Sequence, residues 1–117
     1  MKTLTFVIDI DDTISEWNDN RDYLNFIPKQ NMIDKINSLY DKGHIINLFT
    51  SRGMLSEKGN LSVIDTKLRP PLEEWLKNNN VKHHKLITGK PPSDYYIDDK
   101  NLYIDDFLNK EFDNDKN

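Results

Sequence analysis

Acidic side chains stand at two places in the chain where they could share one bound ion. Asp9, Asp11 and Asp12 lie close together near the N-terminus, and Asp98 and Asp99 lie near the other end. Carboxylate oxygens are the ligands that Mg²⁺ prefers, and carboxylates held close together without a cation repel one another. If folding brings the two groups together, they are suited to hold a divalent cation for phosphoryl transfer.

A hydroxyl group and basic side chains extend this set. Thr50, Ser51 and Arg52 follow a second apolar run, and Lys90 stands in a later loop. Hydroxyl, guanidinium and ammonium groups neutralise and orient phosphate oxygens, so these four residues are the candidate substrate-binding groups. The chain has no cysteine, which excludes thiol catalysis and leaves oxygen and histidine as the only metal ligands.

Short apolar segments precede these residues and are typical of strands buried in a parallel sheet. The expected strands are 3–10, 44–50, 86–88, 95–97 and, at an edge, 102–104. The first of them should be a central strand. In a parallel α/β sheet, ligands bind beyond the carboxyl ends of the strands, and the candidate residues all fall there. The strand period also places Asp9 and Asp11 on the same side if Ile10 is extended.

Apolar residues at helical spacing predict two helices between the strands. One covers about 30–42 and ends before Gly43, and the other begins near Pro70 or Pro71 and runs to about 79. Trp75 belongs to the apolar stripe of the second helix and is expected in the core. Asp105 and Asp106 are typical of the first turn of a further helix.

The remaining segments connect these elements. Loops are expected at 12–28 and 51–64, and a solvated loop around His83 and His84. The alternation of strands and helices indicates a three-layer α/β sandwich with a mostly parallel, Rossmann-like sheet. We expect a single domain at 1–112 and a polar tail at 113–117.

Composition narrows the class of protein. The chain has 117 residues, of which 36% are hydrophobic, and a net charge of −4. This size suits one compact domain, and the charge balance excludes a polybasic nucleic-acid module. We therefore expect no nucleic-acid partner. The first residues lack the long apolar stretch of a signal peptide or membrane helix, so we expect a cytoplasmic protein that does not bind a membrane.

The segment Phe6-Val7-Ile8-Asp9-Ile10-Asp11-Asp12-Thr13 resembles the first motif of the haloacid dehalogenase (HAD) superfamily of aspartate-nucleophile phosphatases. Thr50, Lys90 and Asp98-Asp99 follow in the order of the other three motifs. Asp12 stands where most members have glycine. The chain is more similar still to small members that lack a cap domain and are associated with bacterial capsule and lipopolysaccharide biosynthesis. That similarity rests on Thr50, Arg52, Met54, Gly59, Thr66, Trp75-Leu76, Gly89-Lys90-Pro91, Asp94 and Tyr96-Ile97-Asp98-Asp99.

The resemblance implies a role for each matched residue. Asp9 would be the nucleophile that forms an aspartyl-phosphate intermediate, and Asp11 the general acid and base. Thr50 and Lys90 would hold the phosphoryl oxygens. Mg²⁺ would bind Asp9, the main-chain carbonyl of Asp11 and Asp98, with Asp99 acting from further out or through water.

The resemblance also implies the kind of substrate. It would be a small phosphorylated molecule, by family association a sugar phosphate. The loops are too short to form a cap domain, so the site should be open, to be covered by the substrate, the loops or a second subunit. Arg52 stands two residues beyond Thr50, from where it could reach a phosphate or a leaving group.

Three other functions share part of this residue pattern. A receiver-type signalling domain needs its acceptor aspartate on a middle strand before the threonine, which does not match the order found here. A catalytically silent phosphate- or metal-binding subunit would keep the same residues. A phosphatase that processes nucleic-acid ends would need more positive charge than this chain has.

Overall fold

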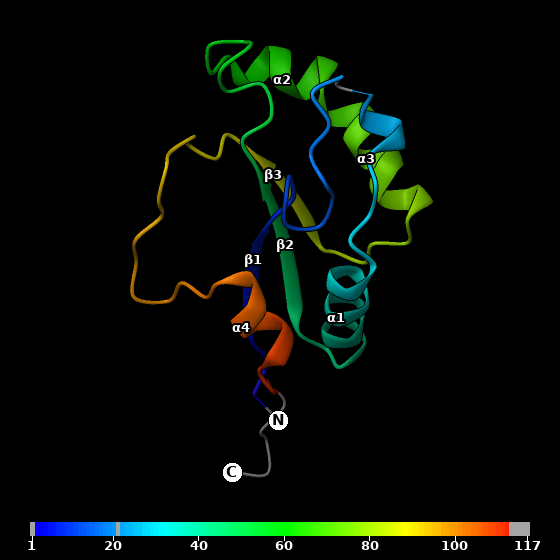
Figure 1. The fold of residues 1–117 in the computed structure, drawn as a ribbon, viewed down its shortest axis with the longest axis vertical. Helices are drawn as coiled ribbons and strands as arrows, with labels where there is room; N and C mark the ends of the chain where they lie inside the picture. The colour runs from blue at the N-terminus through cyan, green and yellow to red at the C-terminus, as the bar shows by residue number, and fades with distance from the viewer. Residues whose placement is uncertain (1, 21, 113–117) are drawn as a thin grey trace.

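A three-stranded parallel sheet forms the centre of the molecule (Figure 1). The computed structural model describes residues 2–20 and 22–112, so the expected tail at 113–117 lies outside the described residues. The strands are β1 (Thr5–Asp9), β2 (Ile45–Thr50) and β3 (Lys85–Thr88), in the order β1-β2-β3. The predicted α/β class and the parallel pairing of these strands are confirmed.

The register aligns the strands so that their carboxyl ends meet at one edge of the sheet. Ile8 lies beside Leu48, and Leu48 beside Leu86, and all three side chains are buried. Thr50 lies beside Thr88 at the end of β2, and Asp9 ends β1 next to Phe49. This register brings the ends of β1 and β2, which carry the predicted chemistry, to the same edge.

The helix predicted at 30–42 is α1 (Gln30–Asp41). Its buried face consists of Met32, Ile33, Ile36 and Leu39, at the spacing of a single helical stripe. Gly43 follows with φ +93°, a left-handed conformation that glycine adopts without strain, and the chain turns there into β2.

The later helices are α2 (Leu61–Lys67), α3 (Arg69–Asn78) and α4 (Ile104–Asn109), and a short 3₁₀ helix, η1, covers Tyr23–Asn25. Prolines occupy the first turn of α3, as predicted, and Trp75 is fully buried. Asp105 and Asp106 lie in the first turn of α4, also as predicted. The loop predicted at 51–64 is shorter in the structure, because α2 begins at Leu61. The side chain of Asn60 caps this helix by accepting a hydrogen bond from the Val63 N–H.

Two predicted strands are absent from the described residues. Tyr95–Ile97 is irregular coil, and Leu102–Ile104 leads into α4 instead of forming an edge strand. Pro91 and Pro92 lie just before this region, lack N–H groups and turn the chain away from the sheet. In the described residues β1 is therefore an edge strand, and its prediction as a central strand was wrong for this structure.

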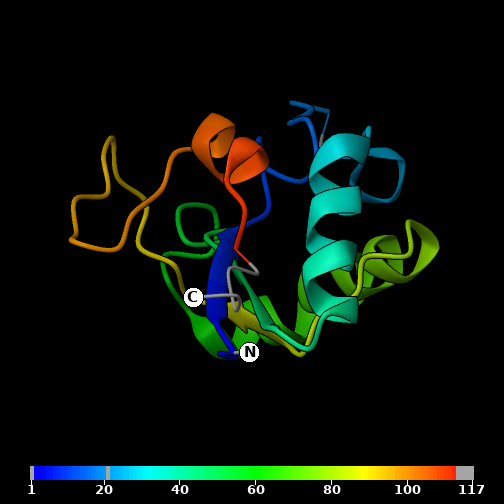
Figure 2. The same ribbon diagram turned by 90° about the horizontal axis from the view of Figure 1, so that it is seen from below.

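Helices cover one side of the sheet. Figure 2 shows α1 and α3 on the same side, where they enclose the buried core. The opposite side carries Val7, Ile45 and Ile87, which are all exposed. Within the described ranges, no helix has both the length and the apolar character needed to cross a membrane.

The expected loop around His83 and His84 is more ordered than a solvated loop. His84 uses its ring Nδ1 to accept a hydrogen bond from the Ile46 N–H at 3.0 Å, and its ring stacks on Tyr40. The imidazole therefore links the start of β3 to β2. This structural role accounts for His84 without any part in catalysis.

Candidate active site

Asp9 ends β1 and is held by two neighbours. Its Oδ1 accepts a hydrogen bond from Lys90 Nζ at 2.9 Å, and its Oδ2 accepts one from Thr13 Oγ1 at 3.0 Å. The side chain keeps 28% of its surface exposed, so an incoming molecule can reach it. A carboxylate in this setting is oriented and accessible, as a nucleophile must be.

A tight turn follows Asp9 and directs the next aspartates. Ile10 is fully buried, and its carbonyl oxygen accepts hydrogen bonds from the N–H groups of Thr13, Ile14 and Ser15. Asp12 sits in this turn with φ +61°, a left-handed conformation that glycine adopts with less strain than aspartate. Its side chain compensates by accepting a hydrogen bond from the Trp17 N–H at 2.9 Å.

Asp11 lies on the same edge of the sheet and is bound by Arg52. Arg52 Nε lies 3.0 Å from Oδ1 and 3.1 Å from Oδ2 of Asp11, and Arg52 Nη2 lies 2.8 Å from Oδ1. Burial raises the pKa of Asp11, and the negative charges of Asp9 and Asp12 raise it further. The hydrogen bonds and the charge of Arg52 lower the pKa again, but the net shift is upward.

Arg52 is itself enclosed by aromatic rings. Its guanidinium carbon lies 4.7 Å from the ring centre of Tyr23 and 5.0 Å from that of Phe26, and its side chain is 2% exposed. Trp75 Nε1 donates a 2.8 Å hydrogen bond to the Phe26 carbonyl oxygen, which ties this loop to α3. Tyr23 and Phe26 were not predicted to belong to the site, although two aromatic residues three positions apart in a polar loop indicate an ordered, packed loop.

Thr50 and Lys90 meet at the ends of β2 and β3. The Lys90 N–H donates a 3.0 Å hydrogen bond to the Thr50 carbonyl oxygen, and the Thr50 hydroxyl accepts one from the Arg52 N–H at 3.1 Å. Lys90 Nζ also lies 4.3 Å from the ring centre of Tyr96. The structure thus joins Asp9, Thr50 and Lys90 in one cluster, with Ser51 between Thr50 and Arg52 in the chain.

Asp98 and Asp99 do not join this cluster. Both lie on an exposed loop, residues 91–103, which we call the projecting segment because it runs out from the sheet between β3 and α4 (Figure 1). Asp98 Oδ1 accepts a hydrogen bond from the nearby Lys100 N–H. The two groups of carboxylates that the sequence suggested as one metal site are therefore apart in this chain.

Gly53 follows Arg52 in the chain, and its replacement by alanine is expected to lower the free energy of unfolding by at least about 2 kcal/mol. Gly53 has φ +81°, and an added Cβ would come within 2.5 Å of Leu68 Cδ1 and 2.7 Å of Ile64 Cγ1. Gly43→Ala is the matched control, because its φ is +93° and nothing lies within 4 Å. Urea unfolding of both variants checks the prediction. Equal losses would show that close packing at Gly53 has no cost.

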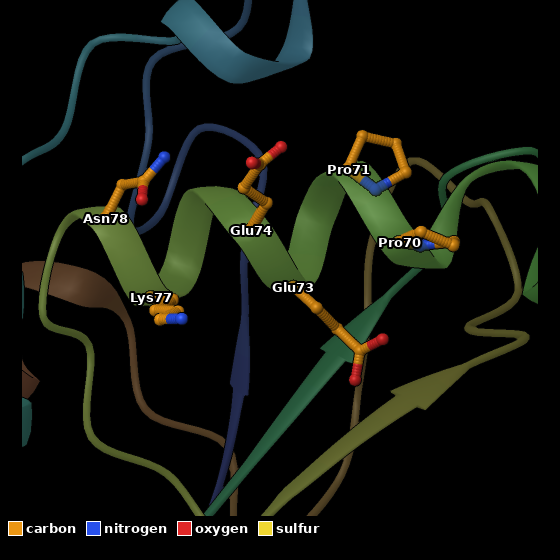
Figure 3. Close-up of a pocket in the computed structure, with 6 residues that line it drawn as sticks. All are labelled: Pro70, Pro71, Glu73, Glu74, Lys77 and Asn78. Atoms are coloured by element: carbon orange, nitrogen blue, oxygen red, sulfur yellow. The ribbon is translucent and has the colours of Figure 1, made fainter.

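The structure also contains a pocket along α3, drawn in Figure 3. Its lining residues are Pro70, Pro71, Glu73, Glu74, Lys77 and Asn78. In Figure 3, Pro71, Glu74 and Asn78 point to one side of the helix and Glu73 to the other. None of the residues predicted to carry chemistry lines this pocket, and it contains no converging set of polar groups.

A comparison with solved structures finds a protein of similar fold. A crystal structure of a structural-genomics target from Vibrio cholerae has 26% sequence identity to this chain and a TM-score of 0.88, and the match covers 96% of this chain and 93% of that one. No protein-family model matches the chain. No curated protein matches it either.

Proposed function

We propose that the chain is a HAD-type, Mg²⁺-dependent phosphomonoester hydrolase that works through an aspartyl-phosphate intermediate. The observation that carries the proposal is the pair Asp9 and Asp11 at the carboxyl end of β1, the first bound by Lys90 and the second by Arg52. The proposal includes a single cytoplasmic domain with a three-layer, Rossmann-like arrangement and no cap, and a sugar phosphate of surface-polysaccharide metabolism as the substrate.

In the first step, a carboxylate oxygen of Asp9 forms a bond to phosphorus while the bond between phosphorus and the leaving oxygen breaks. Asp11 gives its proton to that oxygen, which departs as an alcohol. In the second step, Asp11 takes a proton from a water molecule, whose oxygen attacks phosphorus. The bond between phosphorus and Asp9 breaks, inorganic phosphate leaves, and both aspartates return to their starting states.

The environment of Asp11 supports its role as the proton donor. A general acid works best when its pKa is near the pH of the reaction, and burial raises the pKa of Asp11 above that of an ordinary aspartate. Arg52 donates hydrogen bonds to both oxygens of the carboxylate, which fixes the orientation of the Asp11 side chain. Asp9, more exposed, remains available as a nucleophile.

The basic and hydroxyl groups support phosphate binding. Lys90 Nζ lies 2.9 Å from Asp9 Oδ1, so a phosphoryl group bound at Asp9 would be within its reach. The hydroxyl of Thr50 accepts a hydrogen bond from Arg52, which leaves its own proton for a phosphoryl oxygen. Both groups would stabilise the negative charge of the transferring phosphoryl group.

The metal ligands are only partly assembled in one chain. Bound Mg²⁺ would neutralise and orient phosphoryl oxygens. Asp9 and the carbonyl oxygen of Asp11 are suitable donors, but Asp98 and Asp99 lie on the projecting segment. Among residues 2–20 and 22–112, no three His, Asp or Glu side chains are grouped as a cation site requires.

The proposal predicts hydrolysis of p-nitrophenyl phosphate and of members of a sugar-phosphate panel, with a rate that falls to background when EDTA removes Mg²⁺ and returns when Mg²⁺ is added. Released phosphate and nitrophenolate are measured with and without the metal. No hydrolysis of any ester at any Mg²⁺ concentration would contradict the proposal and favour a silent phosphate-binding subunit.

A further inference from the structure

The projecting segment is unusual for a loop because its apolar side chains face solvent. Every residue from 91 to 103 is exposed. Tyr95 is 83% exposed and Ile97 is 93% exposed, and Leu102 and Tyr103 are exposed as well. Long loops without secondary structure are uncommon in compact domains, and contiguous exposed apolar side chains mark interaction surfaces. The segment therefore has the properties of a surface that is covered by another molecule.

The sheet has an open position that fits such a segment. β1 is an edge strand, so one row of its backbone N–H and C=O groups has no strand beside it among the described residues. The Ile45 N–H donates to the Leu4 carbonyl oxygen, so alternation along the strand turns the backbone groups of Val7 toward the open edge. The side chain of Val7 is 62% exposed, although parallel sheets are normally buried on both faces.

We propose that two copies of the chain exchange their projecting segments, so that residues 95–98 of each copy add a strand, parallel to β1, at the open edge of the other. The parallel direction places the partner's Asp98 at the carboxyl end of β1, beside Asp9. The carboxylates separated in one chain then meet in the dimer, and each active site is built from two copies. This inference rests on the proposed function for its chemistry, but not for its geometry.

A second copy fits better than the chain's own fold as the source of the strand. Both ends of the projecting segment are held by contacts with the rest of the chain. Before it, the Lys90 N–H donates a hydrogen bond to the Thr50 carbonyl oxygen, and after it Phe107 of α4 packs edge-on against Phe6. Between these ends the segment runs out from the sheet, and Figure 2 shows it on the side away from α1. Fully extended, a segment of this length has a contour of roughly 40 Å, and with both ends held its middle can reach roughly 20 Å outward, enough to contact an adjoining molecule.

The structural match extends into the projecting segment. The Vibrio cholerae crystal structure matches 96% of this chain, so at most about five of the 117 residues fall outside the match. The projecting segment is longer than that, so part of it lies inside the matched region. Exchange of an identical element between two copies is a common route to a symmetric dimer. Here it would pair the open edge of β1 and cover the exposed apolar side chains of the projecting segment in the same step.

Complementation between two inactive variants tests the shared site. Asp9→Asn and Asp98→Asn chains are co-expressed with different tags, and the mixed dimer is purified and assayed on p-nitrophenyl phosphate. In an exchanged dimer, one site has both aspartates and the other has neither, so the purified mixed dimer should show about half of the wild-type activity. Each variant alone should be inactive. An active wild type with no restored activity in the mixed sample would overturn the exchange.

Cross-linking tests the geometry without any activity. The chain has no cysteine, so Val7→Cys and Tyr96→Cys can be made as separate single-cysteine chains, expressed together and treated with a short bismaleimide. The register that pairs Asp9 with the partner's Asp98 places Val7 beside the partner's Tyr96. A cross-linked product at twice the 13.8 kDa chain mass is expected from the mixture and not from either variant alone.

The two experiments separate the failure of this inference from failure of the proposed function. A cross-linked dimer of the cysteine variants, together with a wild-type chain that hydrolyses nothing, would retain the exchange and remove the phosphatase. A monomer in sedimentation velocity would overturn the exchange. A Val7→Cys/Tyr96→Cys double variant that links only within one chain would also overturn it, and would show that the chain's own segment folds back on β1.

Discussion

Asp9→Asn is expected to lower the rate of phosphate-ester hydrolysis by at least about 10³-fold, because the amide oxygen cannot replace a carboxylate as the nucleophile. The fold should be almost unaffected. Asp9 lies at the end of β1, partly exposed, and the loss of its contacts with Lys90 and Thr13 should cost less than about 1 kcal/mol. Steady-state rates at saturating substrate and the midpoint of thermal unfolding measure the two effects separately.

Two further variants make this result specific. Asp105→Asn is the matched control, because Asp105 is an exposed aspartate in the first turn of α4, and it should keep the wild-type rate. Asp11→Asn should still let Asp9 attack p-nitrophenyl phosphate, whose leaving group needs no proton, but should slow hydrolysis of the intermediate. A burst of about one nitrophenolate per active site would reveal it. Wild-type turnover by Asp9→Asn would exclude Asp9 as the nucleophile.

The candidate site could be predicted in part from the sequence because several of its residues stand at the ends of strands that the sequence predicts. Asp9 ends β1 and Thr50 ends β2, and a parallel register then brings both to one edge. The bidentate pair between Arg52 and Asp11 could not be predicted in the same way. It joins residues 41 positions apart, and its geometry depends on Tyr23, Phe26 and the burial of the guanidinium.

The strand expected at 95–97 shows where local pattern is insufficient. Tyr95-Tyr96-Ile97 has the composition of a strand, but a strand forms only when another strand satisfies its backbone groups. In the single chain these residues remain coil, although an edge of β1 is open. The local sequence indicates a preference for an extended, half-buried backbone. Whether a neighbouring strand is present to pair with it depends on the assembled sheet.

Arg52→Gln is expected to have the largest effect on stability among the site variants, a loss of about 3 kcal/mol near neutral pH. The guanidinium is buried between two aromatic rings and pairs with a carboxylate that is 21% exposed. Removing it leaves the partly buried Asp11 without its counter-charge. Lys82→Gln is the control, because Lys82 pairs with Asp41 at the surface, where loss of the pair should cost no more than about 0.5 kcal/mol.

The loss caused by Arg52→Gln should depend on pH in a direction that the pKa of Asp11 fixes. That pKa is already raised in the folded protein by burial, and Arg52 is the group that lowers it, so the substitution raises it further. A carboxyl whose pKa is higher in the folded than in the unfolded state favours folding most below the unfolded pKa, and this contribution disappears as the pH rises through the folded pKa. The destabilisation should therefore shrink toward acidic pH, where Asp11 is protonated and needs no counter-charge. Urea unfolding across a pH series, without added metal, measures this trend. A loss that stays constant with pH would mean that Arg52 stabilises the fold through its packing against Tyr23 and Phe26 and not through its charge.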